Sequence, residues 1–186
     1  MNAFPGYGAR CAMRIGALVL MAALASAAMA SGAGTDKPGA GDPAPLFRAK
    51  DIDGRETGLE EILKSGKTVV LNFWGLRCSS CIEEIGYLNP LYEKYRDRGA
   101  VFIGVNVDGV AIDVLRTMMP KMPSVPLYTV LADPAFEIPD LYNMTAAPLS
   151  FVIGKDGKIL YRHEDFRPGD EKGIEDALQK AVSPGK

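Results

Sequence analysis

The chain has few of the side chains on which metal and nucleophile chemistry depends. Its 186 residues include three cysteines and one histidine, His163, which lies far along the chain from the last cysteine, Cys81. A structural zinc site needs four ligands of cysteine, histidine or carboxylate type. We therefore expect no metal site and interpret His163 as a surface residue.

An excess of charge of one sign is also lacking. The formal net charge is −2 at pH 7, and acidic and basic residues are interspersed along the chain. A protein that binds nucleic acid needs a basic surface to neutralise phosphate groups. We therefore expect no nucleic-acid partner.

Long hydrophobic runs are absent except for one, residues 15–30. It holds no charged residue, follows Arg10 and Arg14, and ends in the small-residue pattern Ala-Met-Ala. This order is typical of a secretory signal peptide, here residues 1–30. An uncleaved membrane anchor is the alternative, but the run is shorter than the roughly 20 residues that span a bilayer. We expect an exported protein, periplasmic and soluble after cleavage.

Cleavage would remove Cys11 and leave Cys78 and Cys81 as the cysteines of the mature chain. An oxidising compartment allows them to form an intramolecular disulfide. As a structural cross-link, a disulfide that closes so short a loop stabilises a fold by only roughly 2 kcal/mol. Stability alone is thus a weak reason for this spacing, and electron transfer is the stronger interpretation.

The rest of the sequence predicts one α/β domain, residues 46–184, after a flexible linker, residues 31–45. The linker is rich in glycine, proline and alanine and offers little to a core. Alternating strand and helix patterns predict a central mixed sheet with helices on both faces. We expect strands at 68–74, 101–108 and 127–133, hairpins around Asp53-Gly54 and Asp156-Gly157, and helices at 59–66, 111–119, 134–143 and 170–182, with another of about 18 residues beginning near the cysteines.

Proline lies inside that longest predicted helix. The ring of Pro90 should clash with the carbonyl four residues back, which belongs to Gly86. Because glycine has no side chain and a loose backbone, the bend costs less there. We therefore predict a kinked helix and not two separate ones.

Cys78 is predicted to lie where strand 68–74 ends and the helix begins. Unpaired N–H groups and the positive end of the helix dipole favour a thiolate at that position. Cys81 follows one turn later on the same face, within disulfide reach. Cys78 can then attack a partner's disulfide, and Cys81 can resolve the mixed disulfide. Trp74, at the end of the strand, should shelter one side of the pair and contact the substrate.

Two segments carry a resemblance to a known family: "VVLNFWGLRCSSC" and "AAPLSFVIGKDGKILYRHEDFRPGDE". They resemble the TlpA/ResA-type thiol–disulfide oxidoreductases, exported proteins of the thioredoxin fold. The resemblance implies an inserted helix–strand unit within residues 101–133 and an N-terminal hairpin. It also implies a monomer without a cofactor other than the redox-active disulfide. Its partners would be protein thiol or disulfide substrates, such as apocytochrome c or copper-site proteins, and an upstream membrane electron donor.

The resemblance also assigns roles to residues outside the cysteine pair. Ala147-Pro148 matches the loop whose cis proline faces the cysteines, and the backbone of Ala147 would pair with the substrate as an added strand. Asn72 stands where cytoplasmic thioredoxins keep a buried aspartate, so proton transfer needs another group.

Two neighbouring glutamates are the candidates for that proton transfer. Glu84 shares the buried helix stripe with Cys81 and Leu88, whereas Glu83 should face solvent. In the resembled family a glutamate at the position of Glu84 lies beneath the cysteines and assists proton transfer. We therefore predict Glu84 as a catalytic residue.

Two other functions stay open on the sequence alone. A thiol peroxidase of the peroxiredoxin type would need threonine or serine three residues before the reactive cysteine, where this chain has Gly75. A non-enzymatic module could use the same groove to hold an extended peptide, with a permanent structural disulfide. The resistance of the disulfide to mild reduction would separate this module from an enzyme.

Overall fold

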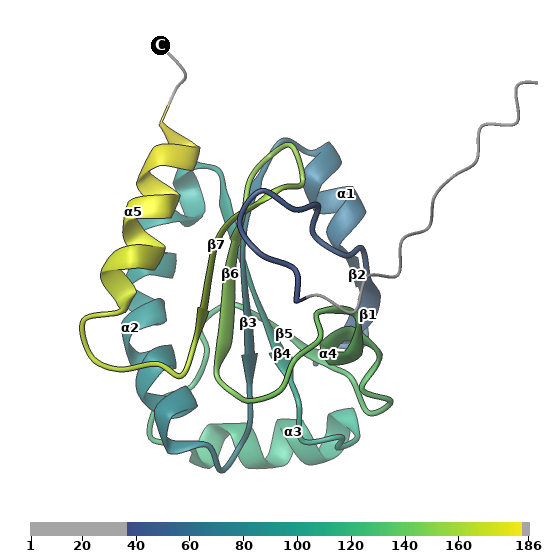
Figure 1. The fold of residues 1–186 in the computed structure, drawn as a ribbon. Helices are drawn as coiled ribbons and strands as arrows, with labels where there is room; N and C mark the ends of the chain where they lie inside the picture. Colours follow the sequence, from purple (N-terminus) through teal and green to yellow (C-terminus); the bar gives the residue numbers. More distant parts are fainter. Residues whose placement is uncertain (1–36, 184–186) are drawn as a thin grey trace, which may run out of the picture. The chain divides into compact units, whose positions relative to one another are not determined.

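The apolar run at 68–74 forms β3, Thr68–Trp74, an interior strand of a seven-stranded mixed sheet in the computed structural model (Figure 1). The structure describes residues 37–183. The predicted signal peptide therefore lies outside the described residues. Every residue of β3 is buried, as expected for a strand covered on both faces.

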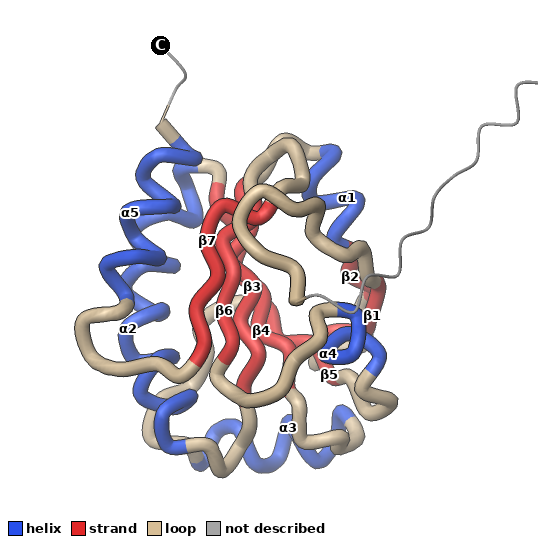
Figure 2. Tube along the Cα trace, viewed as in Figure 1, coloured by secondary structure: helices blue, strands red, loops and turns tan. Residues whose placement is uncertain are grey.

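The strands follow the order β2-β1-β5-β4-β3-β6-β7 across the sheet (Figure 2). β3, β4 and β5 run parallel, and the other neighbouring pairs are antiparallel. The predicted mixed sheet, N-terminal hairpin and inserted helix–strand unit are all present. The remaining strands are β1 Arg48–Asp51, β2 Glu56–Gly58, β4 Ala100–Asn106, β5 Thr129–Ala132, β6 Leu149–Ile153 and β7 Ile159–Glu164.

Helices cover both faces of the sheet, as predicted (Figure 1). α2 and α5 pack on one face, and α1 and α4 pack on the other. Pro90 lies inside α2, so the proline does not end the helix. Within the described residues, no helix is long and apolar enough to cross a membrane. The helices are α1 Leu59–Lys64, α2 Ser79–Tyr95, α3 Ile112–Met118, α4 Glu137–Leu141 and α5 Glu171–Val182, with 3-10 turns η1 Arg96–Arg98 and η2 Met119–Lys121.

Alternation along β3 determines which side chains reach the α2 face. Val69, Leu71 and Phe73 enter the core beneath α1 and α4. The intervening residues therefore point to the opposite face, where Val70 packs with α2 and α5, and Trp74 packs with Cys81. Asn72 is the polar member of this second set, and it is placed beneath α2.

The prediction of a flexible linker is wrong for residues 37–45, which are held by backbone hydrogen bonds. This segment lies along the β6–β7 hairpin, where the Gly41 N–H donates to the Ile159 carbonyl at 2.8 Å and the Ala44 N–H donates to the Gly157 carbonyl at 2.9 Å. The side chain of Ala44 is buried. A glycine- and proline-rich segment can be held by backbone hydrogen bonds, which composition does not reveal.

Candidate active site

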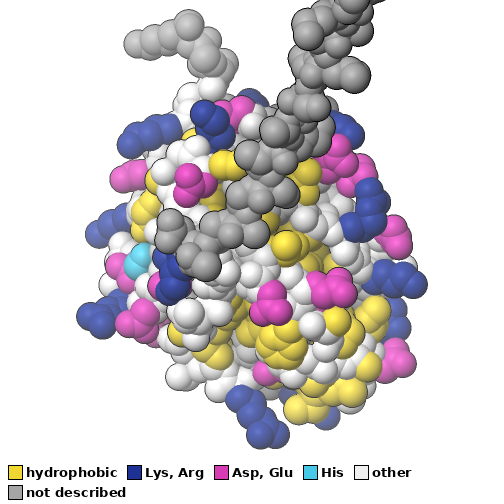
Figure 3. All heavy atoms as spheres, turned by 45° about the vertical axis from the view of Figure 1, so that its right-hand side comes forward, with side chains coloured by type: hydrophobic (Ala, Val, Ile, Leu, Met, Phe, Trp, Pro, Cys, Tyr) yellow, Lys and Arg dark blue, Asp and Glu magenta, His cyan; other side chains and the backbone are white. Residues whose placement is uncertain are grey.

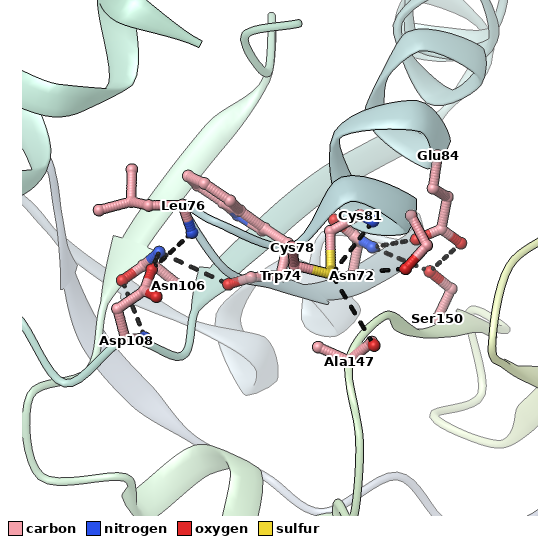
Figure 4. The surroundings of a disulfide bond; sticks show 11 residues. Asn72, Trp74, Leu76, Cys78, Cys81, Glu84, Asn106, Asp108, Ala147 and Ser150 are labelled. Atoms are coloured by element: carbon pink, nitrogen blue, oxygen red, sulfur yellow. Dashed lines mark hydrogen bonds between the residues drawn. A yellow bond between two sulfur atoms is a disulfide. The ribbon is translucent and has the colours of Figure 1, made fainter. Parts of the chain in front are cut away.

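The cysteine pair lies at the junction of β3 and α2, where a disulfide joins Cys78 to Cys81 (Figure 4). Cys78 is the N-cap of α2, and its Sγ accepts a hydrogen bond from the Cys81 N–H at 3.2 Å. The sulfur of Cys78 therefore lies against the unpaired N–H groups of the helix start, which favour a thiolate there.

The two sulfurs differ in their access to solvent. Cys81 has no exposed surface, and its neighbours include Trp74 and Ile85. Cys78 is half-buried, with the Ser80 hydroxyl oxygen 3.5 Å from its Sγ. A bulky partner can reach only the sulfur of Cys78.

Ala147 lies directly beside the accessible sulfur. Its carbonyl oxygen is 3.8 Å from the Sγ of Cys78, and Figure 4 shows it across the sulfur from α2. The Ala147-Pro148 peptide bond is cis. Pro148 itself is buried, whereas Ala147 is half-buried. Of these two predicted substrate contacts, Ala147 offers a partly exposed surface to a partner.

Trp74 is wrongly predicted as a substrate contact. Its side chain has no exposed surface and packs against Cys81 and Leu115 from within the molecule. The bare backbone of Gly104 on β4 leaves room for the indole, because a Cβ built at Gly104 would lie 2.8 Å from Nε1 of Trp74. Trp74 therefore packs against one side of the cysteine pair, as predicted, but offers no exposed surface to a substrate.

Glu84 lies beneath the cysteine pair and is almost fully buried, with 1% of its surface exposed. Its Oε1 accepts from the Ser150 hydroxyl at 2.8 Å, and its Oε2 accepts from the Asn72 side-chain amide at 2.7 Å. Burial raises the pKa of Glu84 to about 7, against the two hydrogen bonds, which lower it; the charge of Asp170 raises it further. Glu84 therefore titrates near neutral pH.

The neighbouring Glu83 is exposed to solvent, as the helix geometry predicts. Ser150 was missed from the sequence, although it is a polar residue inside the apolar strand β6. It lies opposite Asn72 in the β3–β6 register and its hydroxyl also accepts from the Asn72 amide at 3.0 Å. A lone serine in a buried strand is the signal that could have indicated it.

His163 is not the plain surface residue that the sequence predicts. Its ring nitrogen Nε2 lies 2.9 Å from Oδ2 of Asp170, and its ring stacks on Tyr161. Only 21% of its side chain is exposed. The loop before α5 brings Asp170 back to β7, and a sequence pattern does not show that return.

A second polar cluster, also missed from the sequence, holds the loop that carries Cys78. Asp108 follows β4, and its Oδ2 accepts from the Leu76 N–H at 2.7 Å and from the Asn106 amide at 2.6 Å. The Val107 N–H donates to the Trp74 carbonyl at 2.9 Å. These bonds place the loop after β3, and with it the accessible sulfur.

Comparison with known proteins identifies the family. The AhpC/TSA family model matches residues 40–162. The chain is 36% identical to the thiol-disulfide oxidoreductase ResA of Bacillus thuringiensis over 120 residues, which is 64% of this chain and 66%, just under two thirds, of that protein. It is 31% identical to ResA of Bacillus subtilis over 128 residues, or 69% of each chain.

A solved structure shares both fold and sequence with the chain. A Chlorobium tepidum protein assigned as the thiol:disulfide interchange protein DsbE superposes with a TM-score of 0.70 at 30% identity, over 78% of this chain and 99% of that one. The α/β architecture is therefore the thioredoxin-like fold. Within residues 37–183, no three histidine, cysteine, aspartate or glutamate side chains are placed to hold a metal ion. The chain belongs to the AhpC/TSA family, as a member of its ResA-like group of thiol–disulfide oxidoreductases.

Proposed function

We propose that the chain is an exported reductant of disulfides in extracytoplasmic proteins. The observation that carries the proposal is the unequal exposure of one redox pair, with Cys78 accessible at a helix start and Cys81 buried above Glu84. A disulfide kept only for stability needs no such asymmetry. A pair in which one sulfur attacks and the other resolves needs this unequal exposure, because the attacking sulfur must reach the partner and the resolving sulfur must not.

The reaction has two steps that balance in sulfur and electrons. The Cys78 thiolate attacks one sulfur of the substrate disulfide, which forms a mixed disulfide and releases the first substrate thiolate. Cys81 then loses its proton to Glu84, and its sulfur attacks Cys78. This second attack releases the other substrate thiolate and leaves the Cys78–Cys81 disulfide, which an electron donor must reduce again.

The site of action and the substrates are inferred from the N-terminal pattern and from the resemblance. The apolar run at 15–30 after two arginines favours export to the periplasm. Apocytochrome c or copper-site proteins are then candidate substrates, and a membrane protein is the candidate donor. The oxidising compartment explains the need for a donor, since disulfides persist there without one.

A peroxidase is the second candidate, favoured by the AhpC/TSA match. The position three residues before Cys78 argues against it, because Gly75 offers no hydroxyl to a peroxide. Asp108 leaves little space there, since a Cβ built at Gly75 would lie 3.2 Å from its Oδ1. Failure of the reduced protein to consume hydrogen peroxide would exclude this candidate.

Insulin reduction tests the proposed activity. The purified protein is expected to accelerate reduction of insulin disulfides by dithiothreitol, and thiol titration should show its own disulfide opening under mild reduction. A disulfide that stays closed while insulin is not reduced would instead support the non-enzymatic peptide-binding module.

Ser150→Ala tests the contact that holds Glu84. The Ser150 hydroxyl lowers the pKa of Glu84, so its removal should move that pKa further upward. The pH midpoint of mixed-disulfide resolution should rise with it. The variant also loses a buried hydrogen bond, which should lower the free energy of unfolding by about 1–3 kcal/mol. An unchanged pH midpoint in a folded variant would show that Ser150 does not tune Glu84.

A further inference from the structure

An apolar pocket opens beside Cys78, on the side away from Glu84. Figure 4 places Leu76 and Asp108 on one side of Cys78 and Glu84 and Ser150 on the other. The pocket has a volume of about 430 Å³. Its walls include Leu76 and Arg77 from the loop before Cys78, Val114 and Met118 from α3, and Lys121 and Met122 from the turn after it.

Large apolar side chains of this pocket are open to solvent. Val114 is 46% exposed and Met118 is 38% exposed. Figure 3 shows hydrophobic side chains gathered over the lower part of the molecule, where Figure 1 places α3. An apolar pocket with exposed walls can take up a large apolar side chain, and methionine adapts to side chains of different shape.

The charged residues that line the pocket carry a net positive charge, from Arg77 and Lys121 against Asp108. Arg77 and Lys121 are exposed, and within residues 37–183 the side chain of neither makes an ion pair or a hydrogen bond. Asp108 also lines the pocket and carries one negative charge, because the groups that donate to its Oδ2, the Leu76 N–H and the Asn106 amide, are neutral. The pocket therefore combines an apolar floor with two cations that lack a partner.

We propose that this pocket binds the protein substrate next to its reacting cysteine and selects a segment that carries a large apolar side chain and a carboxylate. The inference rests on the proposed function, since it names the substrate of the same site. A segment whose cysteine meets Cys78 has Ala147 on one side and the pocket beside it. The apolar side chain fills the pocket, and the carboxylate pairs with Arg77 or Lys121.

Peptides with one internal disulfide test this preference. They differ only near the attacked cysteine, where one carries leucine and glutamate, a second leucine and lysine, and a third serine and glutamate. The rate at which each oxidises the reduced protein is measured by stopped flow. We expect the lysine peptide to react about twofold to fivefold more slowly than the first at low salt, and the serine peptide about tenfold more slowly.

Charge reversal on the protein provides the matched control. Lys121→Glu should reverse the preference between the glutamate and lysine peptides. Lys155→Glu should leave this preference unchanged. Lys155 is exposed just after β6, next to the start of β3, whereas the cysteine pair follows the end of β3. Lys155→Glu should also reduce insulin at the rate of the unaltered protein, and a thermal melt should show that Lys121→Glu is folded.

Three results would overturn the inference. Equal rates for all peptides, with insulin reduced normally, would contradict the pocket while the proposed function stands. Failure to reduce both insulin and the peptides would remove the proposed function and the inference together. A concentration-dependent dimer that Met118→Lys abolishes would show that a second copy of the chain occupies the pocket.

Discussion

Replacing Cys78 with serine is expected to abolish insulin reduction, with no residual activity above that of dithiothreitol alone. The partner can reach only the half-buried sulfur of Cys78, because Cys81 has no exposed surface. A serine hydroxyl cannot form the mixed disulfide. The measurement is the insulin turbidity rate of the variant, with a thermal melt to show that it is folded.

Cys11→Ser is the matched control for this loss. Cys11 precedes the apolar run and would be removed with a signal peptide, so the substitution should leave the rate unchanged. Retention of most activity in Cys78→Ser would contradict the assignment of attacking and resolving sulfurs.

Glu84→Gln is expected to slow resolution of the mixed disulfide near neutral pH on the order of a hundredfold, the usual contribution of a positioned general base. Cys81 is buried, so its thiolate is disfavoured and its proton needs an acceptor. Glutamine keeps the shape and the Asn72 and Ser150 partners but cannot accept that proton. Stopped-flow measurement of resolution across pH tests this, with the exposed Glu83→Gln as the control.

The same substitution should slow the reaction but raise the free energy of unfolding near neutral pH. Burial raises the pKa of Glu84 from 4.5 to about 7, so between these pH values the folded protein holds a proton that the unfolded chain has released. Stability is therefore present below pH 4.5 and is lost as pH rises through 7, by roughly 3 kcal/mol.

Glu84→Gln removes this pH dependence. The variant should match the unaltered protein at pH 4 and exceed its free energy of unfolding at pH 8. Asp170, across from Glu84 at the start of α5, and Tyr128 and Tyr161 are the other titratable groups coupled to this carboxyl. They are the same in both proteins, so the difference reports Glu84. Urea unfolding at both pH values is the measurement, and parallel stability curves would show that Glu84 is ionised without cost.

Local patterns predicted most of the fold and the centre of the site. The run "TVVLNFW" indicates a strand covered on both faces, because apolar and polar residues do not alternate in it. Glu84 lies three residues after Cys81 and so shares its buried helix face, which distinguishes it from the exposed Glu83. Both signals depend on neighbours within one turn or one strand.

The errors concern contacts between distant segments. Trp74 is buried because Gly104, thirty residues later, leaves space for its ring. Ser150 meets Glu84 only through the register of β6 with β3, and residues 37–45 are held by the far hairpin. No local pattern contains such pairings, because they depend on which strands become neighbours.

The most direct test of the account is to trap the mixed disulfide. Cys81→Ser retains the attacking sulfur and lacks the resolving one, so the protein purified from the cells that produce it should carry substrate proteins bound through Cys78. Mass spectrometry before and after reduction would identify the linked peptides. The account predicts adducts at Cys78 that are absent from Cys78→Ser. Adduct-free Cys81→Ser, or equal adducts at Cys81 in Cys78→Ser, would contradict it.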